Sequence, residues 1–66
     1  MENNIKAIRK SKGLSQKELA TACSVSRQTI NAIENDKYDP TLQLAFHLSV
    51  ILKTPLEELF TFNNKH

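Results

Sequence analysis

Residues 16–35 read QKELATACSVSRQTINAIEN, and this stretch decides the fold. It contains two short segments with helical apolar spacing, separated by the pair Ser24-Val25. Ala20 is small where two such helices would cross. The apolar residues stand where the unit must bury itself: Leu19, Val25, Ile30 and Ile33. Two short helices joined by a tight turn, the second with a polar front half, predict a helix-turn-helix.

Capping residues define where these two helices begin. Ser15 and Glu18 have the spacing of a capping box, in which the hydroxyl and the carboxylate each satisfy a free backbone N–H. Ser26 is the expected cap of the third helix, at about residues 27–35. Ser24 stands in the turn where many helix-turn-helix units have glycine. A positive φ there would cost serine roughly 1 kcal/mol more than glycine.

Three further helices are predicted around this unit. One runs over about residues 4–12 and stops at Gly13. Another begins after the cap Thr41 and continues to about residue 53. A short last helix starts with Thr54 as cap and Pro55 at its first position, and ends near residue 60. Residues 61–66 and 1–4 are candidates for a short terminal β-ribbon. The expected fold class is all-α, a compact five-helix domain spanning residues 1–66.

The small size of the chain restricts how it can be stabilised. A chain of 66 residues forms one domain and buries only about 60% of its unfolded surface, so a partner subunit, a metal or disulfides often reinforce it. Cys23 is the only cysteine, which excludes an internal disulfide and fits a reducing cytosol. His47 and His66 have no ligand spacing, so no metal site or cofactor is predicted. No apolar run resembles a signal peptide or membrane span, and we expect a cytoplasmic protein.

The apolar residues near the C-terminal end favour a partner subunit. The predicted fourth helix is apolar nearly all round, which indicates burial on more than one side. We expect a dimerisation region at about residues 42–62. Its interface residues are predicted to be Phe46, Val50, Leu56, Leu59, Phe60 and Phe62. The alternative is that all of these side chains fold into a single core.

The charge is distributed unevenly along the chain. The net charge is +2, and residues 1–38 hold seven Lys/Arg against four acids, a local net charge of +3. The basic part of the chain is also the part that contains the polar third helix. A basic face is typical of a protein that binds a polyanion. A solvated surface of mixed charge is the alternative.

Several motifs together resemble one known family. They are R…GLSQKELA, VSRQTINAIEN, YDPTLQLA and TPLEELF, and they extend over roughly residues 5–60. As a set they resemble the DNA-binding domains of phage Cro proteins, phage repressors and bacterial Xre-type relatives, which share a lambda-repressor-like fold of five helices. The resemblance implies sequence-specific binding to a double-stranded DNA operator. It also implies a symmetric homodimer that represses transcription. No small-molecule ligand is evident from the sequence itself, and no cofactor is expected.

The resemblance places the third helix in the major groove. Arg27 can bond a guanine edge there and Gln28 an adenine edge, each with two hydrogen bonds. Thr29 and Asn31 are further candidates for base reading. The alternative for each of these side chains is a solvated surface position.

The resemblance also implies contacts to the DNA backbone and one structural pair. The candidate phosphate-binding residues are Gln16, Ser26, Lys37 and Tyr38. Gln16 would act through its side chain and its backbone N–H at the positive end of the second helix. Asp36 and Asp39 flank the loop of Lys37 and Tyr38, where they would repel phosphate or orient Lys37. Arg9 and Glu34 match an ion pair that joins the first and third helices, so we assign them to the scaffold.

Two other functions compete with this interpretation. A protein-interaction module, such as an antitoxin-type partner of another small protein, would use the apolar C-terminal end for a different chain. An enzyme would need a pocket and a set of nucleophile, base and orienting group, and neither histidine has a plausible partner in the sequence. We therefore predict no catalytic residues and no enzymatic activity.

Overall fold

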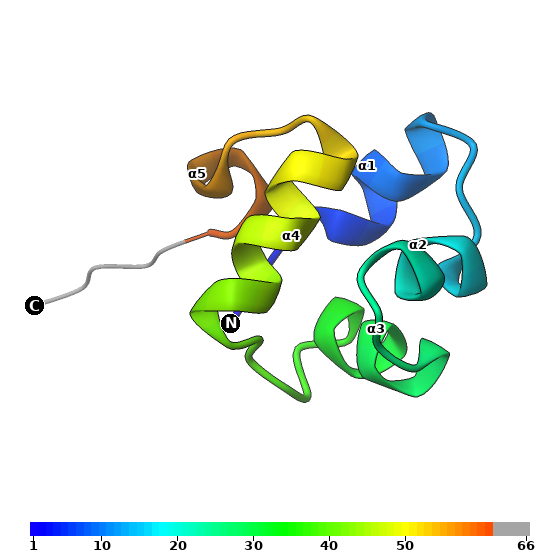
Figure 1. Ribbon diagram of the computed structural model, residues 1–66. Helices are drawn as coiled ribbons and strands as arrows, with labels where there is room; N and C mark the ends of the chain where they lie inside the picture. Colours follow the sequence, from blue (N-terminus) through cyan, green and yellow to red (C-terminus); the bar gives the residue numbers. More distant parts are fainter. Residues whose placement is uncertain (62–66) are drawn as a thin grey trace, which may run out of the picture.

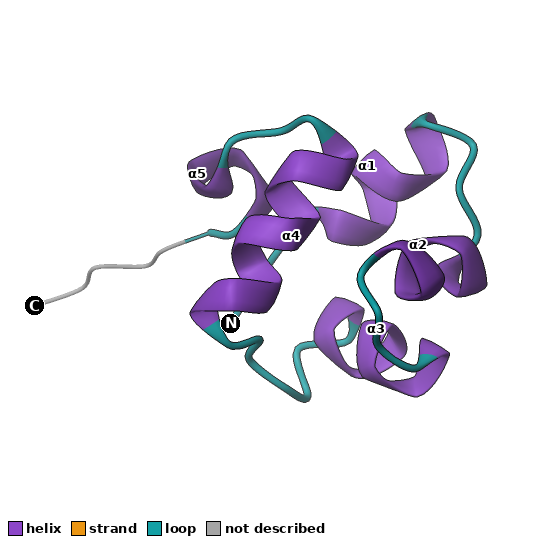
Figure 2. Ribbon diagram, in the orientation of Figure 1, coloured by secondary structure: helices purple, strands orange, loops and turns teal. Residues whose placement is uncertain are grey.

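A computed structural model describes residues 1–61 of the protein, and its fold is the predicted all-α one (Figure 1). The five helices are α1 (Ile5–Ser11), α2 (Gln16–Ala22), α3 (Arg27–Glu34), α4 (Leu42–Leu52) and α5 (Leu56–Leu59). Figure 1 shows α2 and α3 at one end of the domain and α5 at the other, with α4 between them. Short loops join the helices, and no strand is assigned within residues 1–61 (Figure 2).

Most of the predicted helix caps are present. The hydroxyl of Ser15 accepts a hydrogen bond from the backbone N–H of Glu18 at 3.0 Å, and the Glu18 carboxylate accepts one from the Ser15 N–H at 2.8 Å. The hydrogen bond that the carboxylate accepts from the Ser15 backbone N–H lowers the pKa of Glu18, and the nearby Ser15 side chain lowers it further. Ser26 and Thr41 cap α3 and α4 in the same way, each accepting from a backbone N–H three residues on.

The prediction for the start of α5 was wrong. The Thr54 hydroxyl does not cap this helix; it donates to the carbonyl oxygen of Leu52 at 2.9 Å. Pro55 is the N-cap residue, and α5 starts one position later than expected. The reason is local, because the last carbonyls of α4 lack helical partners and the nearby hydroxyl satisfies one of them.

Left-handed residues follow the ends of four helices, α1 to α4, and the one after α2 forms the turn of the helix-turn-helix. Gly13 has φ 72°, as the sequence predicts, and Ser24 has φ 59°, so the expected cost of roughly 1 kcal/mol relative to glycine applies there. Asp36 and Lys53 also have positive φ, at 59° and 51°, which the sequence analysis did not anticipate. Each turn closes with a hydrogen bond from an N–H to the carbonyl five residues earlier, such as that from Val25 to Ala20 at 3.0 Å.

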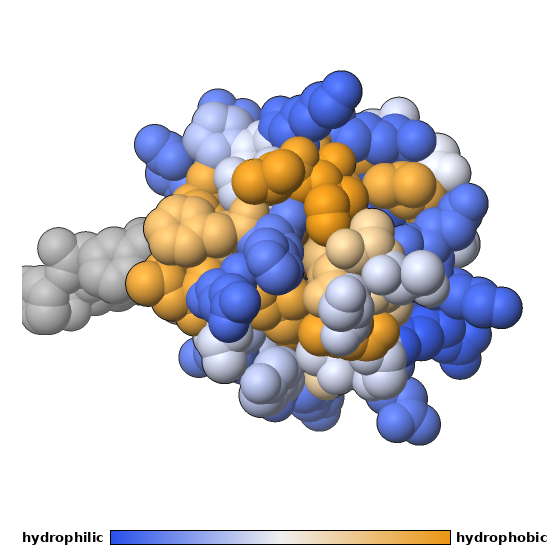
Figure 3. Space-filling view, viewed as in Figure 1, coloured by the Kyte–Doolittle hydropathy of each residue, from blue (hydrophilic) through white to orange (hydrophobic). Residues whose placement is uncertain are grey.

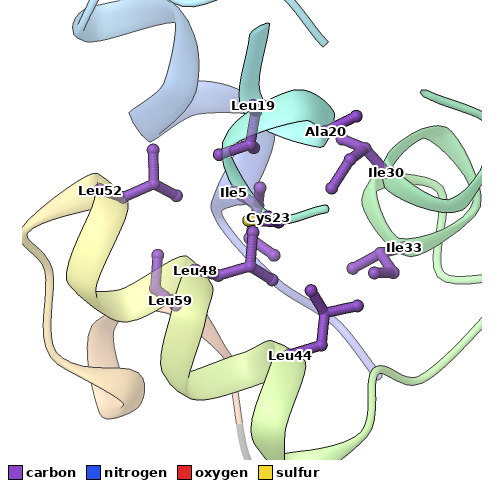
Figure 4. Packing of buried hydrophobic residues seen from close by; sticks show 10 residues of the cluster. All are labelled: Ile5, Leu19, Ala20, Cys23, Ile30, Ile33, Leu44, Leu48, Leu52 and Leu59. Carbon is purple, nitrogen blue, oxygen red and sulfur yellow. The ribbon is translucent and has the colours of Figure 1, made fainter. Parts of the chain in front are cut away.

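One hydrophobic core contains side chains from all five helices (Figure 4). Leu48 of α4 is fully buried, and Figure 4 shows side chains of the other helices arranged around it. The cluster consists of Ile5, Leu19, Ala20, Cys23, Ile30, Ile33, Leu44, Leu48, Leu52 and Leu59. Leu59 is 0% exposed, so its assignment to a dimer interface was wrong. The α5 helix turns this side chain inward because burying one leucine contributes about 1.5–3 kcal/mol.

The predicted terminal ribbon is reduced to one antiparallel bridge between Asn3 and Phe60. The backbone N–H of Asn4 donates to the carbonyl of Leu59 at 2.8 Å, and the N–H of Thr61 donates to that of Glu2 at 2.8 Å. The rest of the proposed ribbon, residues 62–66, lies outside the described residues. The bridge joins the entry to α1 with the exit from α5.

Within residues 1–61, every helix is too short or too polar to span a lipid bilayer.

Candidate nucleic-acid interface

The third helix presents its polar face to solvent because its apolar face is anchored in the core. Ile30 and Ile33 are each 1% exposed and fix the inner side of α3. Arg27, Gln28 and Asn31 are exposed, and at 100° per residue they lie within an arc of about 100° on the outer side. The structure therefore brings three of the four candidate base-reading residues onto one outer face of α3.

The fourth candidate, Thr29, lies beside this face and is half-buried. Its hydroxyl is paired with that of Ser26 at 3.0 Å, and its backbone N–H donates to the Ser26 hydroxyl at 3.1 Å. Ser26 thus both caps α3 and holds the Thr29 hydroxyl. A contact of Thr29 with a base would be made by its methyl group more readily than by its hydroxyl.

A buried ion pair holds α3 against α1. The Nε of Arg9 lies 2.7 Å from Oε2 of Glu34, and its Nη2 lies 3.2 Å from Oε1. The third arm of the guanidinium donates to the carbonyl of Leu14 at 2.8 Å. The two side chains are 8% and 1% exposed. A pair this deep costs about 3–5 kcal/mol when one partner is removed, so it sets the position of the C-terminal end of α3.

Gln16 is tied to this pair rather than directed to solvent. Its Nε2 donates to Oε1 of Glu34 at 3.0 Å and to Oδ1 of Asn31 at 3.2 Å. Asn35 donates to the same Asn31 oxygen at 3.2 Å and to the Asn31 carbonyl at 2.9 Å. Sequence reasoning missed this network, because the contacts depend on how α2 crosses α3. Among the described residues, no buried side-chain nitrogen or oxygen lacks a partner.

The loop after α3 carries the two remaining candidate phosphate contacts. Lys37 and Tyr38 are both exposed. The neighbouring carboxylates are engaged by the N-terminal segment. Asp36 accepts from the side chain of Asn3 at 3.2 Å. Asp39 lies 2.8 Å from the terminal ammonium group, whose pKa is raised first by this hydrogen bond. Both acids therefore have partners within the domain.

The end of the domain away from α3 has an exposed apolar surface. Figure 3 shows hydrophobic surface over α4 and α5, interrupted by hydrophilic side chains. Phe46 and Val50 are 51% and 73% exposed, and Leu42, which the sequence analysis missed, is 69% exposed. These residues follow the spacing i, i+4, i+8, which could have identified Leu42.

The other predicted interface residues lie beside this surface or outside the described chain. Leu56 and Phe60 are half-buried, and they line a groove of about 520 Å³ together with Pro40, Leu42 and Ala45. Phe62 lies outside the described residues.

Known proteins are similar to this chain in sequence and in fold. The helix-turn-helix family HTH_3 matches residues 5–59. An uncharacterised HTH-type transcriptional regulator of Methanocaldococcus jannaschii is 42% identical over 64 residues, which is 97% of each chain. The regulator YgzD of Bacillus subtilis, also uncharacterised, is 37% identical over 60 residues, or 91% of each chain.

Solved structures agree with the sequence comparisons. The restriction-modification controller protein C.AhdI of Aeromonas hydrophila superimposes with a TM-score of 0.78, at 28% identity and over 85% of each chain. The hypothetical transcription factor NHTF from Neisseria gives the same TM-score and identity over 86% of this chain and 66% of its own. The fold and the outward polar helix define a DNA-binding transcriptional regulator. The chain belongs to the helix-turn-helix family HTH_3, which confirms the resemblance found in its sequence.

Proposed function

We propose that the protein is a homodimeric repressor that reads a palindromic operator with α3 in the major groove. The observation that carries this proposal is the outer face of α3, where Arg27, Gln28 and Asn31 stand together on a helix braced from behind. Arg27 would bond guanine and Gln28 adenine, each discriminating by about 1–3 kcal/mol. Asn31 and the Thr29 methyl group would complete the set.

Contacts to the sugar-phosphate backbone would position the helix on the duplex. We assign them to Lys37 and Tyr38, which are exposed directly after α3, and to the capping hydroxyl of Ser26. For Gln16 we assign the contact to its backbone N–H in the first turn of α2, because both donors of its side-chain amide are used inside the protein.

We propose that residues 1–66 form one domain, with the helix-turn-helix at 16–35 and a dimerisation region at about 42–62. The exposed apolar row Leu42, Phe46 and Val50, with the half-buried Leu56 and Phe60, supports this assignment. Phe62 stays a predicted member of the interface. A two-fold dimer would place its two α3 helices about 34 Å apart, one turn of DNA, so its half-sites would form an inverted repeat.

Selection of bound duplexes from a random pool tests the proposal. The wild type should select an inverted repeat, and Arg27→Ala and Gln28→Ala should each relax the preference at defined positions. Lys37→Ala should weaken binding to all selected duplexes alike and reduce the dependence on salt by about one unit of slope. A wild-type chain that enriches no sequence would contradict sequence-specific recognition. Reduced expression of a reporter placed behind the selected sequence would identify the protein as a repressor.

The apolar groove beside α5 supports a second candidate function, that of a protein-interaction module. This groove of about 520 Å³, lined mainly by apolar side chains with Asp39 and Glu57 among them, could also receive an apolar segment of a different small protein, as in an antitoxin-type partnership. The mass of the pure protein in solution separates the two functions. A stable homodimer favours the repressor, and a monomer that dimerises only with another chain favours the interaction module.

A further inference from the structure

The contacts of Asn31 determine which hydrogen-bonding group it offers to DNA. Its amide has one acceptor oxygen and two N–H donors. The oxygen already accepts two bonds, from Gln16 at 3.2 Å and from Asn35 at 3.2 Å. No hydrogen bond within the described residues uses its nitrogen, and the residue is exposed on the outer face of α3.

The buried ion pair fixes this orientation. The Glu34 carboxylate only accepts hydrogen bonds, so it must face the nitrogen of the Gln16 amide, which lies 3.0 Å from it. The second hydrogen on that nitrogen then requires an acceptor, which is the Asn31 oxygen. Rotating the Asn31 amide by 180° would place its nitrogen against two other donors, those of Gln16 and Asn35. The polarity of an exposed side chain thus follows from a buried carboxylate.

We infer that the Asn31 side chain contacts base edges only as a hydrogen-bond donor, through its NH2 group. Gln16 and Asn35 are positioning residues, because their hydrogen bonds occupy the Asn31 oxygen. The inference rests on the proposed function, in which α3 lies in the major groove. An asparagine with both groups free pairs with adenine, accepting from its N6 and donating to its N7. An asparagine with its oxygen occupied favours a base edge that presents acceptors. Guanine offers two such acceptors, N7 and O6, and thymine offers one, O4.

Guanine is therefore the expected base opposite Asn31, with thymine second and adenine disfavoured. This assignment gives Gln16 a role in specificity that does not require it to touch a base. A residue that only contacts phosphate would change the affinity for all duplexes alike. A positioning residue would change the preference at one base position. The two roles therefore have different signatures in a selection experiment.

The test is duplex selection from a random pool with the wild type and three variants. Asn31→Ala should lose its base preference at one position of the duplex, which identifies the base that Asn31 contacts. At that position the wild type should favour guanine over adenine by about tenfold. Gln16→Met combined with Asn35→Ala removes both donors to the Asn31 oxygen. This double variant should lower the guanine-to-adenine ratio at that position by about fivefold or more. Thr21→Ala, an exposed position on α2 outside the network, is the matched control and should leave the profile unchanged.

Two further measurements keep the inference testable if the double variant folds poorly. Asn35→Ala alone removes one of the two donors to the Asn31 oxygen. It should also lower the guanine-to-adenine ratio at the position that Asn31 contacts. In the free wild-type protein, NMR should show slower hydrogen exchange for the side-chain amide of Gln16 than for that of Asn31. The reverse order of exchange would overturn the inference without any DNA.

The outcomes separate this inference from the proposed function. A wild-type chain that selects no duplex overturns both together. A wild type that selects a duplex with adenine opposite Asn31 overturns the donor-only reading alone. The same holds if Asn31→Ala relaxes no position, or if a folded double variant keeps the wild-type profile.

Discussion

Replacing Glu34 with glutamine tests how much the buried ion pair contributes to stability. The two side chains are 8% and 1% exposed, and Glu34 accepts both hydrogen bonds from Arg9 at 2.7 and 3.2 Å. Glu34→Gln keeps the shape and removes the charge, so the Arg9 guanidinium stays buried without a counter-ion. Breaking such a pair costs about 3–5 kcal/mol.

This loss is large relative to the whole domain. At about 0.05–0.15 kcal/mol per residue, a chain of this length has a total stability of roughly 3–10 kcal/mol. A loss of about 3 kcal/mol would lower Tm by about 12–24 °C. Thermal unfolding followed by circular dichroism measures it. Glu2→Gln removes the same charge at an exposed position and is the matched control, with an expected change in stability within about 0.5 kcal/mol.

A second substitution distinguishes loss of the pair from loss of packing. The double variant Arg9→Met/Glu34→Leu removes both charges and should recover most of the lost stability, because apolar replacements of a buried pair are often close to neutral. If Glu34→Gln lowers the unfolding free energy by less than about 1 kcal/mol, the ion pair does not hold α3 against α1.

Three other substitutions test the turn after α2, the proposed dimer surface on α4 and the capping box of α2. Ser24→Gly should raise the unfolding free energy by up to about 1 kcal/mol, because φ is 59° there; the gain is read from Tm, and a loss would contradict it. Val50→Glu should convert the proposed dimer to a folded monomer, measured by sedimentation, because the side chain is 73% exposed in the single chain; an unchanged dimer would exclude this surface. The pKa of Glu18 is lowered in the folded protein, so the Glu18 carboxylate stabilises the fold above its unfolded-state pKa and loses this effect as pH falls through its folded-state pKa. Glu18→Gln should therefore make Tm less dependent on pH in the acid range. An unchanged dependence of Tm on pH would refute the role of the capping box.

The parts of the fold that sequence predicts well are those set by local chemistry. Ser15, Ser26 and Thr41 cap the helices they were expected to cap, because a hydroxyl next to free backbone N–H groups needs no distant contact. Gly13 adopts positive φ for the same local reason. The five helices and their order follow from these signals together with the apolar spacing.

The parts that sequence missed depend on tertiary contacts. Leu59 looked like part of a surplus of apolar residues, but α5 turns it into the core. Asp36 and Lys53 take left-handed conformations that their residue types do not indicate, because the chain must reverse where a helix ends. For the candidate site, the outward face of Arg27 and Gln28 was predictable from periodicity. The engagement of Gln16 was not, because it depends on Glu34, which is 18 residues away in sequence.

The most direct test of the central claim, that the outer face of α3 reads a DNA sequence, is equilibrium binding at one fixed, moderate salt concentration. The duplex selected by the wild type is compared with a scrambled duplex of the same composition. The predicted result is at least about a thousandfold tighter binding to the selected duplex. Arg27→Ala should reduce that ratio by about five- to 150-fold while leaving binding to the scrambled duplex nearly unchanged. Equal affinity of the wild type for the two duplexes would contradict the claim.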